Sequence, residues 1–183
     1  MPDAAGGLSY STSEIGRLEP FESGYGPAMT TIEVAEAGDI EALVNLEGKL
    51  FAEDAARHDP FADISWPQRL GHDDFARLLA SDSSLVLVAR ADAVIIGYLD
   101  GYTFRSSPTR QPVLCAELRS MYIEAAYRRS SFGRLLTEQF VSWARARSCV
   151  EVHVDCYTAN HAAQHFYQAS GFDARSVQRV LRL

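Results

Sequence analysis

The chain has 183 residues, of which 47% are hydrophobic and 22% are charged, and its formal net charge at pH 7 is -7. A chain of this length and composition is typical of a single domain that buries a substantial core. The acidic balance argues against nucleic acid as a partner and favours cationic small molecules.

Signals for a membrane, for disulfides and for metals are weak. No apolar run is long enough to cross a bilayer and the N-terminus has no signal-peptide pattern, so we expect a cytoplasmic protein without a membrane partner. Cys115, Cys149 and Cys156 show no CxxC spacing, which argues against a disulfide framework and a zinc site. His161 and His165 stand one helical turn apart without an evident third ligand, so we expect no metal.

The chain divides into an N-terminal extension and one domain. Residues 1–28 are rich in Gly, Ser, Pro and Ala and show no periodicity, which is typical of a flexible extension. The alternating residues 29–34 predict a first strand. The domain is therefore predicted to span residues 29–183.

Helices and strands alternate through this domain. Asp39 caps a predicted helix that reaches residue 51, an irregular stretch covers residues 53–74, and a short helix lies around residues 75–79. Residues 85–89 and 94–104 predict a hairpin, and residues 113–123 predict the next strand. A turn over residues 124–133 leads into an amphipathic helix, and residues 150–155 alternate as a half-buried strand.

The last predicted elements are a helix from Asn160 to Gly171 and a terminal strand over residues 177–183. This order of elements predicts an α/β (α+β) fold. We expect a mixed, mostly antiparallel central sheet that is flanked by helices.

The turn before the amphipathic helix has the composition of a phosphate site. A helix N-terminus presents unpaired amides and a partial positive charge, and both favour phosphate oxygens. Small side chains allow close approach of the backbone, and arginines add charge. The residues concerned are Arg128, Arg129, Ser130, Ser131, Phe132, Gly133 and Arg134. The alternative is an ordinary basic turn capped by its serines.

Two further segments give this turn a context. A strand over residues 116–123 precedes it, and the pattern Asn160-(x2)-Ala163-(x3)-Tyr167-(x3)-Gly171-Phe172 follows. With them, the chain resembles the GNAT family of N-acetyltransferases from about residue 30 to its end. The resemblance implies the family's fold and acetyl-CoA as the co-substrate.

The resemblance also implies roles for individual residues. Backbone groups of Met121 and Ile123 would pair with the pantetheine arm. Amides of residues 129–134 would hold the pyrophosphate, Asn160 would reach the pantetheine side, and Tyr167 would stand near the sulfur. Ser131 departs from the family pattern, which has glycine there. If this position needs a positive φ, serine costs about 1 kcal/mol; we favour the case in which it needs only a small residue.

Acetyl transfer from a thioester asks for a neutral amine and a proton for the departing thiolate. Tyr167 is the predicted acid, with a packed core tyrosine as the alternative. Glu117 is the predicted base, acting through water, because alternation puts it on the strand face of Ile123. The alternative is a solvent-facing or salt-bridged glutamate. His153 and Asp155 are reserve candidates for the base.

The irregular stretch after the first helix is acidic and aromatic. Asp54, His58 and Trp66 are its candidate acceptor-binding residues, and such a rim suits an amine; a solvated charged loop is the alternative. We therefore expect an acetyl-CoA-dependent transferase that acts on a primary amine of a small cationic molecule. A protein N-terminus or lysine stays open as the acceptor.

A non-catalytic acyl-CoA-binding module is the rival hypothesis. Ser131 and the short segment after Phe172 favour it, whereas Glu117 and Tyr167 argue against it. Many relatives in the resembled family dimerise, so a homodimer through the terminal strand is also considered.

Overall fold

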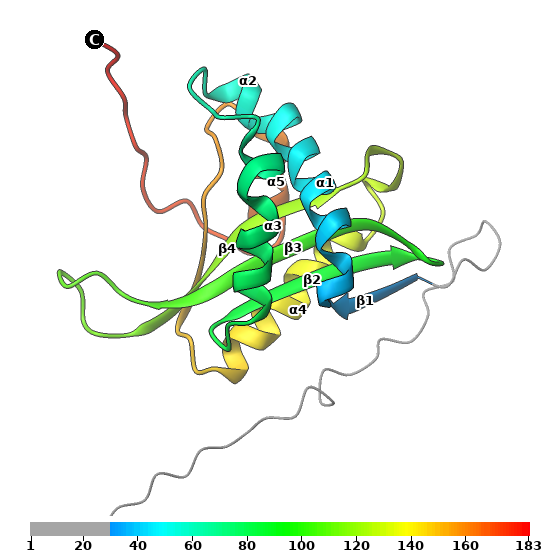
Figure 1. Ribbon diagram of the computed structural model, residues 1–183. Coiled ribbons are helices and arrows are strands. Elements are labelled where there is room, and N and C mark those ends of the chain that lie inside the picture. The colour runs from blue at the N-terminus through cyan, green and yellow to red at the C-terminus, as the bar shows by residue number, and fades with distance from the viewer. Residues whose placement is uncertain (1–29) are drawn as a thin grey trace, which may run out of the picture.

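The computed structural model describes residues 30–183 (Figure 1), so the extension over residues 1–28 lies outside the described residues. Five strands form one sheet in the order β1-β2-β3-β4-β5. They are β1 Thr30–Val34, β2 Ser84–Ala91, β3 Val94–Arg105, β4 Leu114–Ile123 and β5 Glu151–Val154. The first four are antiparallel neighbours and β5 pairs with β4 in parallel. The predicted mixed, mostly antiparallel sheet is confirmed.

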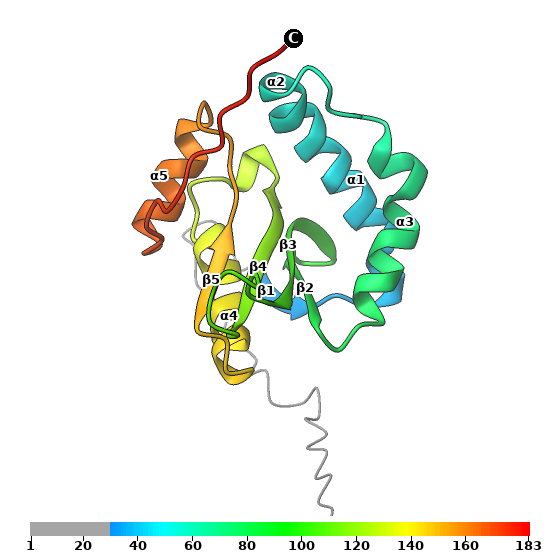
Figure 2. The same cartoon turned by 90° about the vertical axis from the view of Figure 1, so that its left-hand side faces the viewer.

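Helices cover both faces of this sheet, as Figure 2 shows. On one face lie α1 Ile40–Leu50 and α3 Trp66–Leu79. On the other lie α4 Phe132–Ala146 and α5 His161–Ala169. A π-helical stretch, Phe51–Ala55, continues α1 into the short α2, Ala56–His58.

The interior strand β2 shows why a strand can have a continuous apolar sequence. Leu85, Leu87 and Ala89 pack into the core under α4, whereas Val86 and Val88 pack into the core under α1 and α3. A strand that is covered on both faces has no solvent side that would call for polar residues.

Two predicted elements are wrong. The stretch over residues 53–74 is not irregular throughout, because α3 already begins at Trp66, with Pro67 in its first turn. Proline is well suited to that position, where its missing amide proton would have no partner. The terminal strand is also wrong: residues 173–183 adopt no strand. This tail runs along the outside of the molecule, where Arg182 lies over the Phe61 ring (Figure 1).

A bulge in β4 reverses the alternation of its side chains. Asp100 of β3 pairs with Ser120, but the next residue, Gly101, pairs with Leu118, so Arg119 is the extra residue. Residues on either side of a bulge lose their simple two-residue alternation. The prediction that Glu117 shares the face of Ile123 is therefore wrong.

Instead, Glu117 shares the α1 and α3 face with Tyr102, its partner on β3, whose hydroxyl donates a 3.0 Å hydrogen bond to the Glu117 carboxylate.

Within residues 30–183, no helix has both the length and the apolar character that crossing a membrane requires.

Candidate active site

A cleft opens where β4 and β5 separate, and we call it the β4–β5 cleft. The two strands pair only between residues 115–118 and 151–154, so the edge of β4 beyond Leu118 faces the cleft without a neighbouring strand. The cleft has a volume of about 580 Å³. Its lining includes Met121, Ile123, Arg128, Arg129, Ser130, Gly133, Asn160 and Tyr167. The fold thus brings most of the sequence-predicted cofactor residues together.

One end of the cleft is the turn that begins α4. Among the described residues, none of the main-chain amides of residues 129–134 donates a hydrogen bond to the protein. Ser131 is the N-cap residue of α4, but its side chain does not cap the helix. Six consecutive free amides at a helix N-terminus form a concave donor surface for an anion such as a pyrophosphate.

The backbone conformation of this turn shows whether Ser131 adopts a positive φ. Its φ is −69°, so the alternative in which this position needs a positive φ is excluded, and that it needs only a small residue stays a prediction. The positive φ lies two residues earlier, at Arg129, with a value of 61°. Gly133 packs closely against α5 instead, because a Cβ there would make a tight contact of 3.3 Å with the Phe166 ring.

The arginines of the turn have different surroundings. Arg128 donates to the Glu53 carboxylate and to the Ile123 carbonyl, both at 2.7 Å. Arg134 points along α4 to Glu138, at 2.8 Å. Arg129 lines the cleft and has no ion-pair partner within residues 30–183. Arg129 is therefore the arginine most available to an anionic ligand.

The α5 helix brings Asn160 and Tyr167 to the other side of the cleft. The Asn160 side chain accepts a 3.0 Å hydrogen bond from the Ala163 amide, and its own amide donates to Asp54 at 2.8 Å. The predicted cap at the start of this helix is thus confirmed. Burial, with the charges of Cys156 and Asp54, raises the pKa of Tyr167, so its phenol stays protonated at neutral pH.

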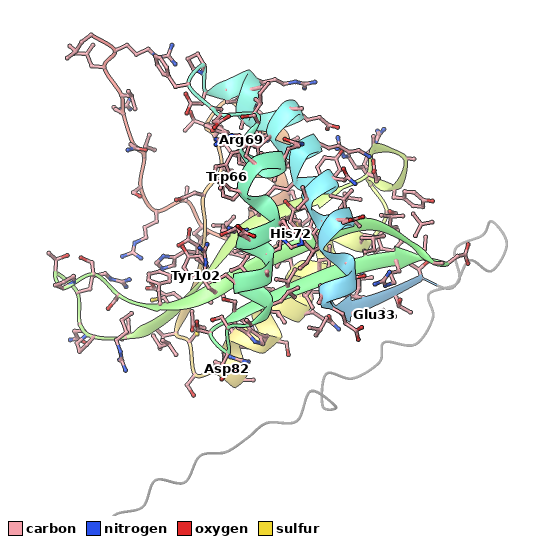
Figure 3. All side chains as sticks on the ribbon, in the orientation of Figure 1. Glu33, Trp66, Arg69, His72, Asp82 and Tyr102 are labelled. Carbon is pink, nitrogen blue, oxygen red and sulfur yellow. The ribbon has the colours of Figure 1, made fainter. Side chains whose placement is uncertain are left out.

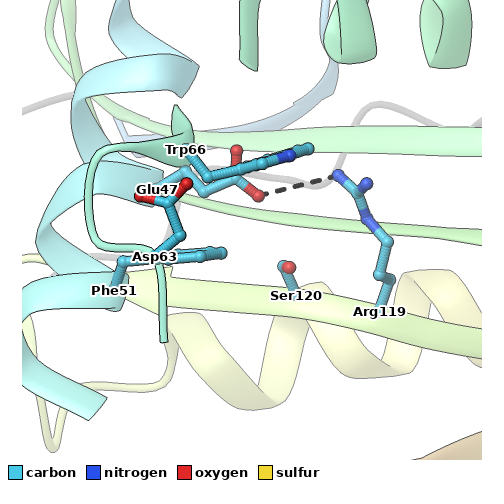
Figure 4. A pocket seen from close by; sticks show the side chains of 6 residues that line it. All are labelled: Glu47, Phe51, Asp63, Trp66, Arg119 and Ser120. Atoms are coloured by element: carbon cyan, nitrogen blue, oxygen red, sulfur yellow. Dashed lines mark ion pairs between the residues drawn. The ribbon is translucent and has the colours of Figure 1, made fainter. Parts of the chain in front are cut away.

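A second cavity of about 340 Å³ adjoins the cleft, and we call it the Trp66 cavity (Figure 4). It is lined by Glu47, Phe51, Asp63, Trp66, Arg119 and Ser120. The two cavities have Arg119 and Ser120 in common. Trp66 lies at the N-terminal end of α3, near Arg69 (Figure 3).

The three predicted acceptor residues are therefore divided between two places. Trp66 lines the second cavity, whereas Asp54 and His58 line the β4–β5 cleft. There the His58 ring lies 3.4 Å from the Asp54 carboxylate and packs on Tyr157, with ring centroids 5.2 Å apart.

Arg119 organises a buried charge network beside the Trp66 cavity. Its guanidinium group donates to Asp100 at 2.6 and 3.1 Å, donates to Asp74, and lies 3.7 Å from Glu47. Burial raises the pKa of Glu47 to about 7, although Arg119 opposes the shift. Burial likewise raises the pKa of Asp100. Three carboxyl groups thus compete for one guanidinium group inside the protein.

Glu117 is not among the residues that line either cavity. It neighbours His153 on β5, so both side chains share one face of the sheet. His153 contacts Glu151 at 2.9 Å, and a Cys115 thiol completes a group of three potential metal ligands. However, Arg110 already holds both Glu151 oxygens, at 2.7 and 2.9 Å, so this carboxylate is neutralised without an ion.

Sequence reasoning missed Glu47 and Arg119. Glu47 lies four residues after Leu43 and three before Leu50, inside the apolar stripe of its helix, and a carboxyl group in such a stripe signals a buried site. Arg119 carries a weaker signal, because a charged residue in a strand is ordinary on an exposed face. Its place among three carboxyl groups depends on the bulge in β4 and on tertiary contacts.

Comparisons with known proteins agree with this geometry. The model of the Acetyltransferase (GNAT) family matches residues 49–172. Aminoglycoside N(6')-acetyltransferase type 1 of Acinetobacter genomosp. 13 is 31% identical over 118 residues, which cover 60% of this chain and 77% of that protein. N-alpha-acetyltransferase RimI of Mycobacterium tuberculosis is 28% identical over 149 residues, which cover 81% of this chain and 82% of that protein.

Solved structures share the fold. A tetramutant of the Bacillus halodurans protein BH1408 superposes with a TM-score of 0.76 and 21% identity, over 83% of this chain and 99% of that one. Aminoglycoside N-acetyltransferase AAC(6')-Iy, in complex with CoA, gives a TM-score of 0.68 and 19% identity, over 84% of this chain and 94% of that one. The family match covers more than half of the chain, and the protein belongs to the GNAT family of acetyltransferases.

Proposed function

We propose that this acetyl-CoA-dependent N-acetyltransferase transfers the acetyl group to a primary amine of a small cationic molecule. The observation that carries the proposal is the junction of two cavities at Arg119 and Ser120. One cavity has free amides for an anionic cofactor, and the other has acidic and aromatic walls that suit a cationic acceptor.

The residues of the β4–β5 cleft fit acetyl-CoA as the ligand. Free amides of residues 129–134 and the unpaired Arg129 would hold the pyrophosphate. The open edge of β4 at Met121 and Ile123 would pair with the pantetheine arm as an added strand does. The Ile123 carbonyl already accepts from Arg128, and its second lone pair would serve the ligand.

Acetyl-CoA supplies an activated thioester, so the protein has mainly to position the amine and to move two protons. The amine nitrogen attacks the carbonyl carbon, and the carbon–sulfur bond breaks. We assign Tyr167 as the acid that protonates the departing sulfur, because this residue lines the cleft and its raised pKa keeps the proton in place.

The base is assigned to Glu117, which takes the amine proton through water. Two observations support the assignment: Glu117 lies on the sheet face of Ser120, which both cavities share, and only one carboxylate oxygen bonds Tyr102. Replacing Glu117 with Gln is expected to lower kcat and to remove the acidic limb of its pH profile. An unchanged profile would assign the base elsewhere.

Two acceptor classes follow from the relatives. The Acinetobacter relative is an aminoglycoside N(6')-acetyltransferase and the Mycobacterium relative is an N-alpha-acetyltransferase. We favour a small polyamine-like or aminoglycoside-like acceptor, because the Trp66 cavity combines a small volume with acidic groups. A protein N-terminus is the second candidate.

Release of CoA from acetyl-CoA, measured with a panel of amines, tests the function. Small di- and polyamines are expected to be acetylated faster than neutral or acidic molecules that carry an amine. Tight binding of acetyl-CoA without turnover on any amine would contradict the proposal and would favour a non-catalytic acyl-CoA-binding module.

A further inference from the structure

The Glu47 carboxyl group is enclosed and incompletely paired. Its residue is 1% exposed, its Oε1 lies 3.7 Å from Arg119, and its Oε2 is buried with no hydrogen-bond partner among the described residues. Gly71 of α3 lies close to this oxygen, since a Cβ there would be in van der Waals contact with Oε2 at 3.6 Å. A buried acceptor without a donor costs free energy, so a ligand that supplies a donor is favoured.

Two aromatic rings line the same cavity as this carboxyl group. They belong to Trp66 and Phe51, and Figure 4 shows both residues beside Glu47. The two rings are stacked, with centroids 5.9 Å apart and an interplanar angle of 12°. Aromatic faces attract cations, and tryptophan attracts them most strongly. The walls and the unpaired oxygen therefore favour the same kind of ligand.

The charges around the Trp66 cavity sum to a negative value when its carboxyl groups are ionised, which favours a cationic ligand. Glu47, Asp74 and Asp100 share the guanidinium group of Arg119, and Arg77 pairs with Asp74 from the surface. When all three carboxyl groups are ionised, the network carries one uncompensated negative charge. Asp63, at the cavity rim, is already paired with Arg69.

We propose that the Trp66 cavity binds an ammonium group of the acceptor as a cation against Glu47, while a second amine of the same molecule is acetylated. The inference rests on the function proposed above and names its substrate class: molecules with two or more amines. A nitrogen held between a carboxylate and aromatic faces keeps its proton and has no lone pair to attack a thioester. The reacting amine must therefore be a different one, beyond Ser120 in the β4–β5 cleft.

A comparison of terminal diamines with monoamines of equal carbon length tests this inference. In the unaltered enzyme, kcat/KM for the best diamine is expected to exceed that of its matched monoamine roughly 10- to 100-fold. Glu47→Gln keeps the shape of the side chain and is expected to remove most of this selectivity through a higher KM for the diamine. Glu41→Gln, on the exposed face of the same helix, is the matched control and should leave the selectivity unchanged.

Trp66→Leu tests the aromatic wall without altering the charge network. The selectivity for the diamine is expected to fall roughly fivefold or more. The inference is overturned if diamines show no advantage over monoamines, or if the advantage survives both Glu47→Gln and Trp66→Leu.

Calorimetric titration of the same diamine into the enzyme, without acetyl-CoA, separates this inference from the proposed function. Diamine binding that is lost in Glu47→Gln supports the cation site even if no amine is acetylated. Acetylation that is indifferent to Glu47 supports the function and overturns the cation site.

Discussion

The β4–β5 cleft and the Trp66 cavity meet at the same two residues, but they are built in different ways. The cleft presents main-chain amides of one continuous turn, residues 129–134. The Trp66 cavity presents side chains from α1, α3 and β4, among them Glu47, Trp66 and Arg119. A site made of main-chain amides depends less on the identity of each side chain, whereas a site of buried charges depends on each partner.

The largest effect on turnover is expected in the cleft, from Tyr167→Phe. Loss of a general acid lowers kcat about 100- to 10,000-fold. The affinity for acetyl-CoA should change little, because the ring and its contacts with Phe166 and Phe172 are kept. Single-turnover rates and calorimetry with acetyl-CoA measure the two quantities. An unaffected rate would show that the thiolate receives its proton from another group.

The largest effect on stability is expected beside the Trp66 cavity, from Arg119→Met. Removing the guanidinium group leaves Glu47, Asp74 and Asp100 without their shared partner. The expected loss is about 3–5 kcal/mol in the free energy of unfolding, measured by urea denaturation. The matched change in the cleft, Arg129→Met, should alter stability by about 0.5 kcal/mol or less and weaken acetyl-CoA binding instead. Equal losses in the free energy of unfolding for Arg119→Met and Arg129→Met would contradict this difference between the two regions.

A smaller and pH-dependent effect is expected from Glu47→Gln. The folded protein raises the pKa of Glu47 from 4.5 to about 7, so it binds this proton more tightly than the unfolded chain does. The stability that comes from this group is complete below pH 4.5 and is lost as the pH rises through 7. Glu47→Gln should therefore be more stable than the unaltered protein at pH 8, by about 1–3 kcal/mol, and similar to it at pH 4.5.

Denaturation at several pH values measures this difference. The titratable and charged groups that face Glu47 are Asp63, Asp74, Tyr98, Asp100 and Arg119. Higher stability together with weaker diamine binding in one variant is the signature of a site that sacrifices stability for recognition. A loss of stability at pH 8 would show that Glu47 is a structural partner of Arg119 and not a vacant ligand site.

The smallest effects are expected within the phosphate turn. Ser131→Gly should change stability by a few tenths of a kcal/mol and acetyl-CoA affinity by less than about twofold, because φ is negative there. Arg129→Gly should stabilise the protein by about 1 kcal/mol, since it relieves a φ of 61°, while removing a charge from the cleft. A large gain in affinity from Ser131→Gly would contradict the free-amide account of this turn.

The contrast between the two regions also explains what the sequence could predict. The turn and the capped helix could be predicted because both are local patterns: Ser131 begins α4 after the turn, and Asn160 caps α5 through the Ala163 amide three residues later. The face of Glu117 was not predictable, because the bulge at Arg119 reverses the alternation and leaves no local signature. The start of α3 was missed because Trp66-Pro67 resembles a break, although it is a helix start.

The Trp66 cavity could not be predicted as a whole. Its residues come from segments that are far apart in the chain, and only the tertiary fold decides that Glu47 faces Arg119 and that Asp54 does not join Trp66. The prediction of a terminal strand is wrong for a related reason: an apolar segment forms a strand only where a sheet edge pairs with it, and Val177, Val180, Leu181 and Leu183 are instead exposed.

The central claim is that the two regions form one continuous site for a thioester and a diamine. Its most direct test is the affinity of a bisubstrate ligand, CoA whose sulfur is joined through an acetyl bridge to a terminal diamine. Calorimetry should show that it binds about 100-fold or more tightly than CoA, because its second half binds intramolecularly. Most of that gain should disappear in Glu47→Gln. A bisubstrate ligand that binds no more tightly than CoA, or whose gain is unchanged in Glu47→Gln, would contradict the account.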